Sequence, residues 1–234
     1  MQVLDEDRGL ASVLRPQDRA AATQRLVAAE LRVPRGRWDP DHPLGASASD
    51  LGFLILDGLF LRQASLGRHV CVELLGAGDL LRPWDVDEPD ASPLAHRAKW
   101  QVVESGRLAV LDARFATLAG RFPPLVAAML SRTIRRSQWL ALLMAVSAMP
   151  RLDARLLAVL WHLADRWGRV GTEGTQVPVR LTHETLAGLV GAQRPSVTTA
   201  LRALEGRGLI RRGDGGGWLL LGDPPRDPER AAMA

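Results

Sequence analysis

Residues 181–212, LTHETLAGLVGAQRPSVTTALRALEGRGLIRR, decide the fold, because they have the pattern of two short helices joined by a glycine turn. Apolar residues recur at helical spacing in the first part, where Thr182 is the predicted N-cap and Glu184 lies in the first turn. Gly191 supplies the turn, since glycine adopts a positive φ without steric strain. Pro195 is tolerated in the first turn of the second helix, because the N–H it lacks would have no intrahelical partner. The stretch predicts a helix-turn-helix.

The residues after the second helix predict a β-hairpin. The run Ile210–Arg212 can form one strand and the run Trp218–Leu221 the returning strand, while residues 213–217 between them include four glycines. A glycine-rich turn between two short apolar runs is typical of a hairpin. Two helices joined at a glycine also occur in many other folds, and it is this hairpin, or wing, that favours a winged helix-turn-helix.

The outer face of the second helix and the wing are rich in basic and polar side chains. Residues 192–212 contain five arginines and one acid, Glu205, whereas residues 1–150 are nearly balanced, with 18 basic and 17 acidic residues. A local basic face neutralises phosphates and releases counterions. We therefore expect contacts to double-stranded DNA from side chains that can reach base edges or phosphates. These are Thr182, Gln193, Arg194, Ser196, Thr199, Arg202, Arg211 and Arg212.

Composition sets the outer limits. The chain has 234 residues, of which 47% are hydrophobic, so it can bury a core and fits two domains. No apolar run approaches the roughly 18 residues of a membrane helix, and the first ten residues lack the apolar segment of a signal peptide. The single cysteine, Cys71, excludes an intrachain disulfide framework, a four-cysteine zinc site and a four-cysteine iron–sulfur cluster. We expect a cytoplasmic protein that has no membrane partner and no cofactor.

The N-terminal half predicts one helix and then many short strands. Pro16 can open a helix that runs through Asp18 to Ala29. Strands with turn signals at intervals of roughly 8–12 residues suggest a small barrel or jelly roll. The predicted strands are 51–56 and 59–61 around an Asp57-Gly58 hairpin turn, 70–75 closed by residues 76–79, and 100–104 and 108–112 around Ser105-Gly106.

A long helix is predicted from Pro123 to Ala148. Its apolar seam at Val126, Met129, Leu140 and Leu143 is longer than one small barrel can cover, which favours a partner helix and a homodimer. The alternative is a core helix lying on its own barrel. With Pro150 as a hinge, the predicted domains are a sensor barrel (1–120), a dimerisation helix (121–149), a winged helix-turn-helix (150–222) and a disordered tail (223–234).

In this order of elements the chain resembles the Crp/Fnr family of bacterial transcription regulators over nearly its full length. Residues 194–210, RPSVTTALRALEGRGLI, resemble the family pattern R-E-T-V-S-R-x-L-x-x-L-E-x-x-G-L-I, and residues 74–81, LLGAGDLL, resemble I-L-G-P-G-D-x-F. The resemblance implies an α+β fold: an N-terminal jelly-roll β-barrel of cyclic-nucleotide-binding type, a long dimerisation helix and a C-terminal winged helix-turn-helix. It also implies a homodimer that binds a near-palindromic operator, with RNA polymerase as a further partner.

The departures from the family pattern concern the ligand. Cyclic-nucleotide-responsive members have a Gly-Glu pair whose glutamate accepts from the ribose and an Arg-Ser/Thr-Ala whose arginine pairs with the phosphate, where this chain has Arg82-Pro83 and His96-Arg97-Ala98. The ribose acceptor is gone and the arginine is one position out of register. We expect no response to cyclic AMP and an unknown small-molecule effector, with Arg82 and Arg97 as candidate ligand-binding residues. A fumarate–nitrate type sensor requires a cluster of cysteines, which this chain does not have. A haem sensor stays open, although His42, His69 and His96 have no ligand-like context.

The recognition helix also departs from the family. Arg194 keeps the first base-reading arginine, whereas Pro195 replaces the following glutamate and Thr199 replaces a later arginine. The operator is therefore expected to differ from the family consensus.

The sequence also bears on two other classes of function. Scattered histidines without metal-ligand spacing argue against an enzyme, so no catalytic or metal-binding residues are predicted, and Gly76-Ala77-Gly78 is interpreted as a turn. A non-DNA-binding adaptor or scaffold dimer of the same fold is the alternative. The sequence does not specify the effector, the operator and regulated genes, or whether the protein activates or represses.

Overall fold

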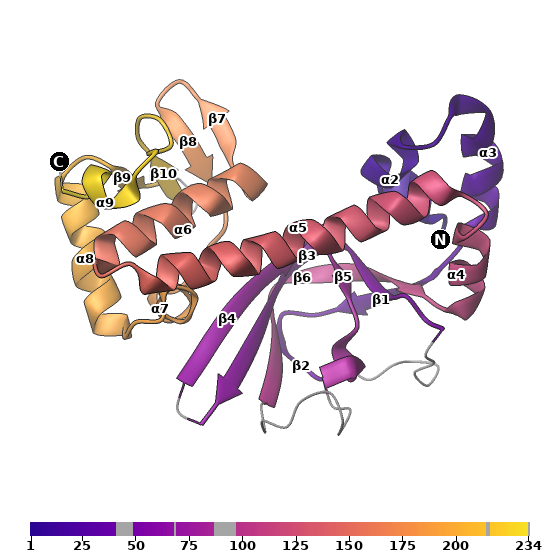
Figure 1. The fold of residues 1–234 in the computed structure, drawn as a ribbon, viewed down its shortest axis with the longest axis horizontal. Coiled ribbons are helices and arrows are strands. Elements are labelled where there is room, and N and C mark those ends of the chain that lie inside the picture. The colour runs from indigo at the N-terminus through magenta and orange to yellow at the C-terminus, as the bar shows by residue number, and fades with distance from the viewer. Residues whose placement is uncertain (41–48, 68, 87–96, 214–215, 234) are drawn as a thin grey trace. The chain divides into compact units, whose positions relative to one another are not determined.

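The computed structural model describes residues 1–40, 49–67, 69–86, 97–213 and 216–233. The chain divides into two compact units, Met1–Gln138 and Trp139–Ala234, each with its own antiparallel sheet (Figure 1). The long helix α5 (Pro123–Ala148) gives its first part to the first unit and its remainder to the second. The predicted α+β class is confirmed.

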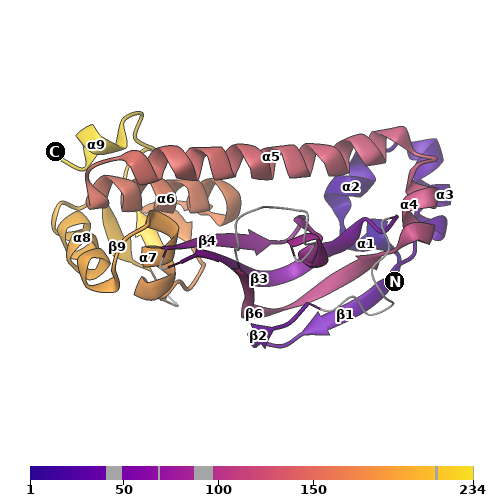
Figure 2. The same cartoon turned by 60° about the horizontal axis from the view of Figure 1, so that its bottom comes forward.

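The first unit is built on a sheet with the strand order β1-β6-β3-β4, in which β2 also pairs with β6 and β5 with β3. Figure 2 shows the first part of α5 along the side of this sheet that carries β3 and β4. The other elements, in chain order, are α1 (Val3–Glu6), α2 (Arg8–Ser12), α3 (Pro16–Arg25), β1 (Ala29–Val33), β2 (Gly36–Trp38), β3 (Gly52–Leu66), β4 (His69–Gly76), β5 (Leu80–Leu81), the 3-10 helix η1 (Pro83–Val86), β6 (Arg97–Leu111) and α4 (Ala113–Ala119).

The two hairpin turns predicted at Asp57-Gly58 and Ser105-Gly106 are wrong. Each dipeptide lies inside a 15-residue strand, and these two strands, β3 and β6, pair with each other along their length. The register shifts where the two dipeptides meet. A Cβ atom on Gly58 would lie 2.5 Å from the Cα of Gly106, so the two backbones approach too closely for a side chain. The glycines therefore permit a bulged bend in a continuous strand pair.

The first predicted helix is shorter than expected. α3 ends at Arg25, because residues Ala29–Val33 pair with β6 instead of continuing the helix to Ala29. Pairing in a sheet has here overridden the helical preference of an alanine-rich segment. Leu26, directly after α3, is buried in a cluster with Val3 and Leu10 of α1 and α2, which the sequence did not predict.

Aromatic rings fill the second core of this unit. The Trp38 ring lies 5.4 Å from Phe60 and 5.7 Å from Trp100 between centroids, and Phe53 lies 5.3 Å from Trp84. Edge-to-face pairs at these distances add to the gain from burial. The inner face of the sheet is thus closed by side chains.

The second unit has a four-stranded sheet in the order β7-β8-β10-β9. The hairpin predicted after the helix-turn-helix is confirmed, since β9 pairs antiparallel with β10 from Ile210–Leu220 to Arg212–Trp218. The elements, after the end of α5, are α6 (Leu152–Trp167), β7 (Arg169–Gly171), β8 (Gly174–Val177), α7 (His183–Val190), α8 (Arg194–Gly206), β9 (Ile210–Arg212), β10 (Trp218–Leu220) and α9 (Pro228–Ala231).

Part of the tail expected to be disordered is ordered, since Pro228–Ala231 form the short helix α9. α9 contacts α6, and Ala232 is completely buried. The Arg207 guanidinium donates to the Ala232 carbonyl. The composition of the tail did not reveal this contact, because Arg207 lies directly after α8 and not in the tail.

Candidate nucleic-acid interface

α7 and α8 form the predicted helix-turn-helix. The Thr182 hydroxyl caps α7 by accepting from the Thr185 N–H at 3.0 Å. Gly191 adopts the left-handed conformation at φ 63°, and the Ala192 N–H then donates to Ala187 O at 2.9 Å. Each helix buries its apolar face, which fixes the orientation of the opposite face of α8.

The outer face of α8 is open to solvent. The five residues predicted there are all exposed: Gln193, Arg194, Ser196, Thr199 and Arg202. Arg194 is the first residue of the helix, where unpaired N–H groups give a partial positive charge. Arg202 lies two turns further on the same face, so the two guanidiniums can address separate parts of one groove.

The wing arginines, Arg211 and Arg212, are exposed but make contacts with neighbouring side chains. Arg211 pairs with Glu173, and the Arg212 guanidinium carbon lies 3.9 Å above the centre of the Trp218 ring. A guanidinium nitrogen of Arg212 also lies 2.9 Å from Nε2 of His183. These contacts orient both side chains before any DNA is bound. A DNA phosphate that contacts Arg211 must, however, share the guanidinium with the Glu173 carboxylate.

His183 is a residue that the sequence did not single out. Its Nδ1 lies 2.8 Å from the Thr198 hydroxyl, which itself donates to Arg194 O at 3.1 Å. The hydroxyl therefore accepts from Nδ1–H, which leaves Nε2 free to accept from Arg212. Burial, followed by the charges of Arg212 and Arg194, lowers the pKa of His183, which keeps this neutral form. The imidazole thus links the recognition helix to the wing.

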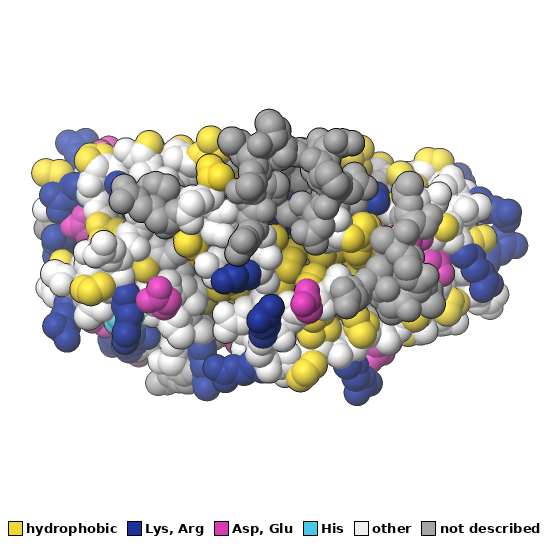
Figure 3. Space-filling model, turned by 90° about the horizontal axis from the view of Figure 1, so that it is seen from below, with side chains coloured by type: hydrophobic (Ala, Val, Ile, Leu, Met, Phe, Trp, Pro, Cys, Tyr) yellow, Lys and Arg dark blue, Asp and Glu magenta, His cyan; other side chains and the backbone are white. Residues whose placement is uncertain are grey.

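Arg180 is a second basic residue that the sequence analysis missed. It is exposed, and a Cβ atom on Gly216 would lie 3.8 Å from its side chain, so Arg180 lies beside the wing turn. Arg180 lies two residues before Thr182, the N-cap of α7, and so falls outside the helix-turn-helix pattern. On the face shown in Figure 3, Lys and Arg side chains predominate over Asp and Glu.

Arg207, by contrast, is structural. It lies 3.0 Å from Asp153, a buried carboxylate that also pairs with Arg151 at 2.7 Å. Hydrogen bonds, first from Arg151 and then from Arg207, outweigh burial and lower the pKa of Asp153 to about 2. The cluster anchors the C-terminal end of α8, and the charge of Arg207 is partly compensated by Asp153.

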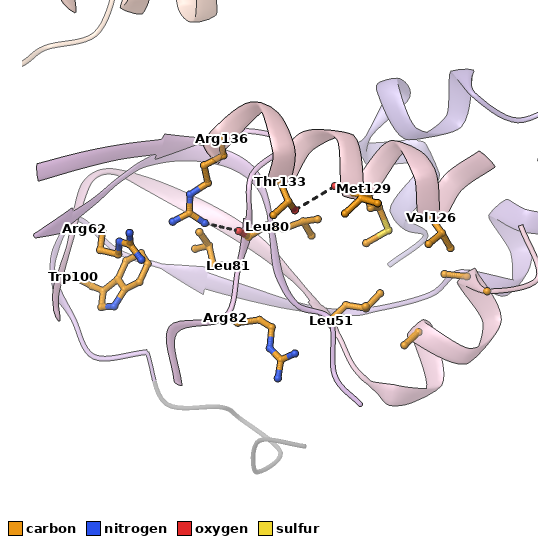
Figure 4. Close-up of a pocket in the computed structure, with 14 residues that line it drawn as sticks. Leu51, Arg62, Leu80, Leu81, Arg82, Trp100, Val126, Met129, Thr133 and Arg136 are labelled. Carbon is orange, nitrogen blue, oxygen red and sulfur yellow. Dashed lines mark hydrogen bonds between the residues drawn. The ribbon is translucent and has the colours of Figure 1, made fainter. Parts of the chain in front are cut away.

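The candidate ligand residues fall in different places. Arg82 lines a cavity in the first unit (Figure 4), whereas Arg97 lies in β6 with its backbone paired to Ser65 and its side chain outside the described residues. Pro83, at the position of the family glutamate, is buried at the start of η1. His42 and His96 lie outside the described residues.

The seam predicted for α5 is only partly exposed. Met129 and Leu143 are buried within the chain itself, Leu140 is half-buried and Val126 is 44% exposed. The exposed face instead carries Val126, Leu130 and Ile134 in the first unit and Ala141 and Met144 in the second. The predicted seam is corrected accordingly, since buried Met129 and Leu143 cannot face a partner.

Among the described residues, no group of three His, Cys, Asp or Glu side chains could hold a metal ion, and no helix is long and apolar enough to cross a membrane. Cys71 on β4 is exposed as a free thiol. Partial burial of its sulfur and the nearby Glu73 carboxylate raise the pKa of that thiol.

The second unit thus defines a winged helix-turn-helix with a solvent-exposed recognition helix. Residues 154–226 match the model of the Crp-like helix-turn-helix domain. The Regulatory protein CysR of Synechococcus elongatus is 29% identical over 84 residues, which cover 35% of this chain and 41% of CysR. The chain thus spans less than half the length of this curated relative.

Solved structures share the fold over most of the chain. A CooA mutant from Carboxydothermus hydrogenoformans superposes with a TM-score of 0.66 at 18% identity, covering 99% of this chain and 94% of that one. The c-di-GMP responsive global regulator CLP of Xanthomonas campestris gives 0.60 at 17% identity, covering 93% and 100%. The C-terminal domain is therefore Crp-like, the fold is that of Crp/Fnr regulators, and the resemblance found in the sequence is confirmed.

Proposed function

We propose that this protein is a DNA-binding transcription regulator of the cytoplasm, and not an enzyme. The observation that carries the proposal is the exposed face of α8, where Arg194 and Arg202 lie, while the apolar residues of the same helix are buried. Helices presented in this way enter the major groove, where an arginine can donate two hydrogen bonds to guanine. The Crp-like match over the same residues supports this proposal.

The protein acts as a homodimer through α5 in this proposal. The exposed apolar residues Val126, Leu130, Ile134, Ala141 and Met144 follow a spacing of three or four, with polar Ser137 among them, which is the pattern of a helix seam. A two-fold dimer presents two recognition helices about 34 Å apart, and its operator is a near-palindrome. RNA polymerase is the further partner that the family resemblance implies.

The effector in this proposal is not cyclic AMP. Pro83 replaces the ribose acceptor, and rigid aromatic rings occupy the inner core of the sheet. Activation or repression depends on where the operators lie relative to promoters.

The test is genome-wide identification of bound DNA fragments, followed by fluorescence anisotropy on the recovered site. We expect a near-palindromic motif and nanomolar affinity that is lost on scrambled DNA at the same salt concentration. Equal affinity for scrambled DNA, or no binding to either, would favour the adaptor.

A further inference from the structure

One histidine of the second unit contacts both elements from which DNA contacts are predicted. His183 is the half-buried first residue of α7, and it is not among the residues that the sequence predicts to contact DNA. Its Nδ1 lies 2.8 Å from the hydroxyl of Thr198 in α8, and its Nε2 lies 2.9 Å from a guanidinium nitrogen of Arg212 in β9. The imidazole therefore lies where the two helices and the wing meet.

The two partners of the ring determine where its hydrogen lies. Thr198 has one hydroxyl hydrogen, which it donates to Arg194 O at 3.1 Å, so the hydroxyl can only accept from the ring. A guanidinium can only donate, so Nε2 must accept from Arg212. Both contacts require the same neutral tautomer, with its hydrogen on Nδ1. An imidazolium would place an N–H against the guanidinium N–H and bring two positive charges together.

The surroundings of the ring favour its neutral form. Burial, and then the charges of Arg212 and Arg194, hold the pKa of His183 below its ordinary value. Arg202 acts in the same direction, and Glu205 acts against it. The acceptor for Arg212 is therefore present at neutral pH.

The guanidinium of Arg212 is held on two sides. Its carbon lies 3.9 Å above the centre of the Trp218 ring, which is itself only 1% exposed. Stacking on a buried ring fixes the plane of the guanidinium, and the bond to Nε2 of His183 fixes its rotation within that plane. Because a guanidinium carries five N–H groups, one bond to an imidazole does not prevent a bidentate contact with a phosphate.

We propose that His183 is a positioning residue for DNA binding, because it holds the Arg212 guanidinium on Trp218 in an orientation that receives a backbone phosphate. The first helix of a helix-turn-helix crosses the DNA backbone, so an arginine fixed beside the first residue of α7 lies where a phosphate passes. Holding the side chain before binding reduces the conformational entropy that is lost in the complex. The bond from Nδ1–H to Thr198 anchors the ring on α8. The effect on DNA binding rests on the proposed function, whereas the orientation of Arg212 does not.

The first test is NMR on the full chain without DNA, isotope-labelled at the histidine nitrogens, at neutral pH. The signals of His183 are those that disappear in His183→Gln. We expect a hydrogen on Nδ1 and none on Nε2, which the chemical shifts of the two nitrogens distinguish. A hydrogen on Nε2, or an imidazolium, would overturn the inference. This measurement is made on the wild type, so it is decisive even if another variant does not fold.

The second test is a double-mutant cycle on the affinity for the recovered DNA site, measured by anisotropy. His183→Phe keeps a ring but removes both hydrogen bonds, and it should weaken binding about threefold to tenfold, the effect of releasing one long side chain. In the Arg212→Gln background, His183→Phe should have no further effect, because it acts through that arginine. His183→Gln should restore most of the affinity, since its amide offers one donor and one acceptor.

Arg211→Gln is the matched control, because Arg211 is adjacent to Arg212 on β9 but pairs with Glu173. Its effect on affinity should add to that of His183→Phe. Additive effects of His183→Phe and Arg212→Gln would refute the positioning role while the proposed function stands. A wild type that binds no DNA would refute the proposed function and with it the role of His183 in DNA binding, and the tautomer would then bear only on the orientation of Arg212.

Discussion

Arg194 is the residue on which sequence recognition is expected to depend. It is exposed at the start of α8 and forms no salt bridge with any of the described residues. If it donates to guanine O6 and N7, Arg194→Ala should cost about 1–3 kcal/mol on the operator and relax the preference at one base pair per half-site. Anisotropy titrations on operator and singly substituted sites measure both effects.

Arg211→Ala is the matched comparison, because Arg211 lies on the wing and already pairs with Glu173. It should weaken operator and scrambled DNA equally and reduce the salt slope by about one. If Arg194→Ala also weakens both DNAs equally, Arg194 contacts phosphate and does not read a base.

His162 should make the stability of the second unit depend on pH. Its ring stacks on Trp139 at an interplanar angle of 8°, and burial, with a smaller effect of Arg166, lowers its pKa to about 4. Because the unfolded histidine titrates near 6.5, the unfolded state binds the proton first, and stability is lost as pH falls from about 6.5 to 4. Below that window the loss is constant.

The measurement is urea unfolding of wild type and His162→Phe between pH 7.5 and 4. The variant cannot titrate, so the stability difference between the two proteins should change by about 1–2 kcal/mol over this range, after allowance for partial exposure of the ring. A difference that stays constant with pH would contradict the role of His162.

At the scale of elements, β3 and β6 show what a single sequence cannot specify. Asp57-Gly58 and Ser105-Gly106 have the composition of hairpin turns, and short apolar runs lie on both sides of each. Dipeptides of the same composition also occur where two glycines face each other across a bulge, as Gly58 and Gly106 do here. The distinction depends on pairing over some 50 residues, which local patterns do not contain. The winged helix-turn-helix was predictable because its caps, turn and hairpin are all local.

Gly106 tests this bulged bend. A Cβ atom there would lie 2.4 Å from Asp57 O, a backbone atom that cannot rotate away. Gly106→Ala should destabilise the first unit by about 2 kcal/mol or more, as measured by denaturant unfolding. Gly120→Ala is the control, since its Cβ would meet only ordinary contacts at 3.5 Å or longer. Equal stability of the two variants would show that the strands do not approach as described.

At the scale of the whole molecule, the exposed apolar face of α5 offers a test of the proposed homodimer. Ile134 is 48% exposed on α5 and does not line the cavity, so Ile134→Glu places a charge on the proposed dimer surface without disturbing the pocket. Sedimentation equilibrium at micromolar concentration should show a dimer for the wild type and a monomer for this variant. Ser131→Glu, exposed about a quarter-turn from the seam, should remain dimeric. A wild-type monomer would rule out the homodimer.

The same distinction applies to the candidate site: some of its residues could be predicted from a local stretch of sequence, and others come together only in the folded chain. The polar residues predicted on the outer face of α8 come from one continuous stretch of sequence, residues 193–202, and all five of them are exposed. His183 joins α7, α8 and the wing only after folding, and the cavity gathers residues from positions 51 to 136. Their spacing along the chain shows no periodicity that a motif could capture.

The isolated thiol of Cys71 gives the protein a ready attachment point for a fluorophore. Cys71 and Glu73 lie two positions apart on β4 and so share one face of the strand. A maleimide dye at Cys71 would therefore report from beside the carboxylate that joins Arg62 and Arg136, two residues that line the cavity of the first unit. Because the pKa of the thiol is raised, labelling proceeds faster at mildly alkaline pH. A single tag of this kind would allow ligand occupancy to be followed optically in the unmutated chain.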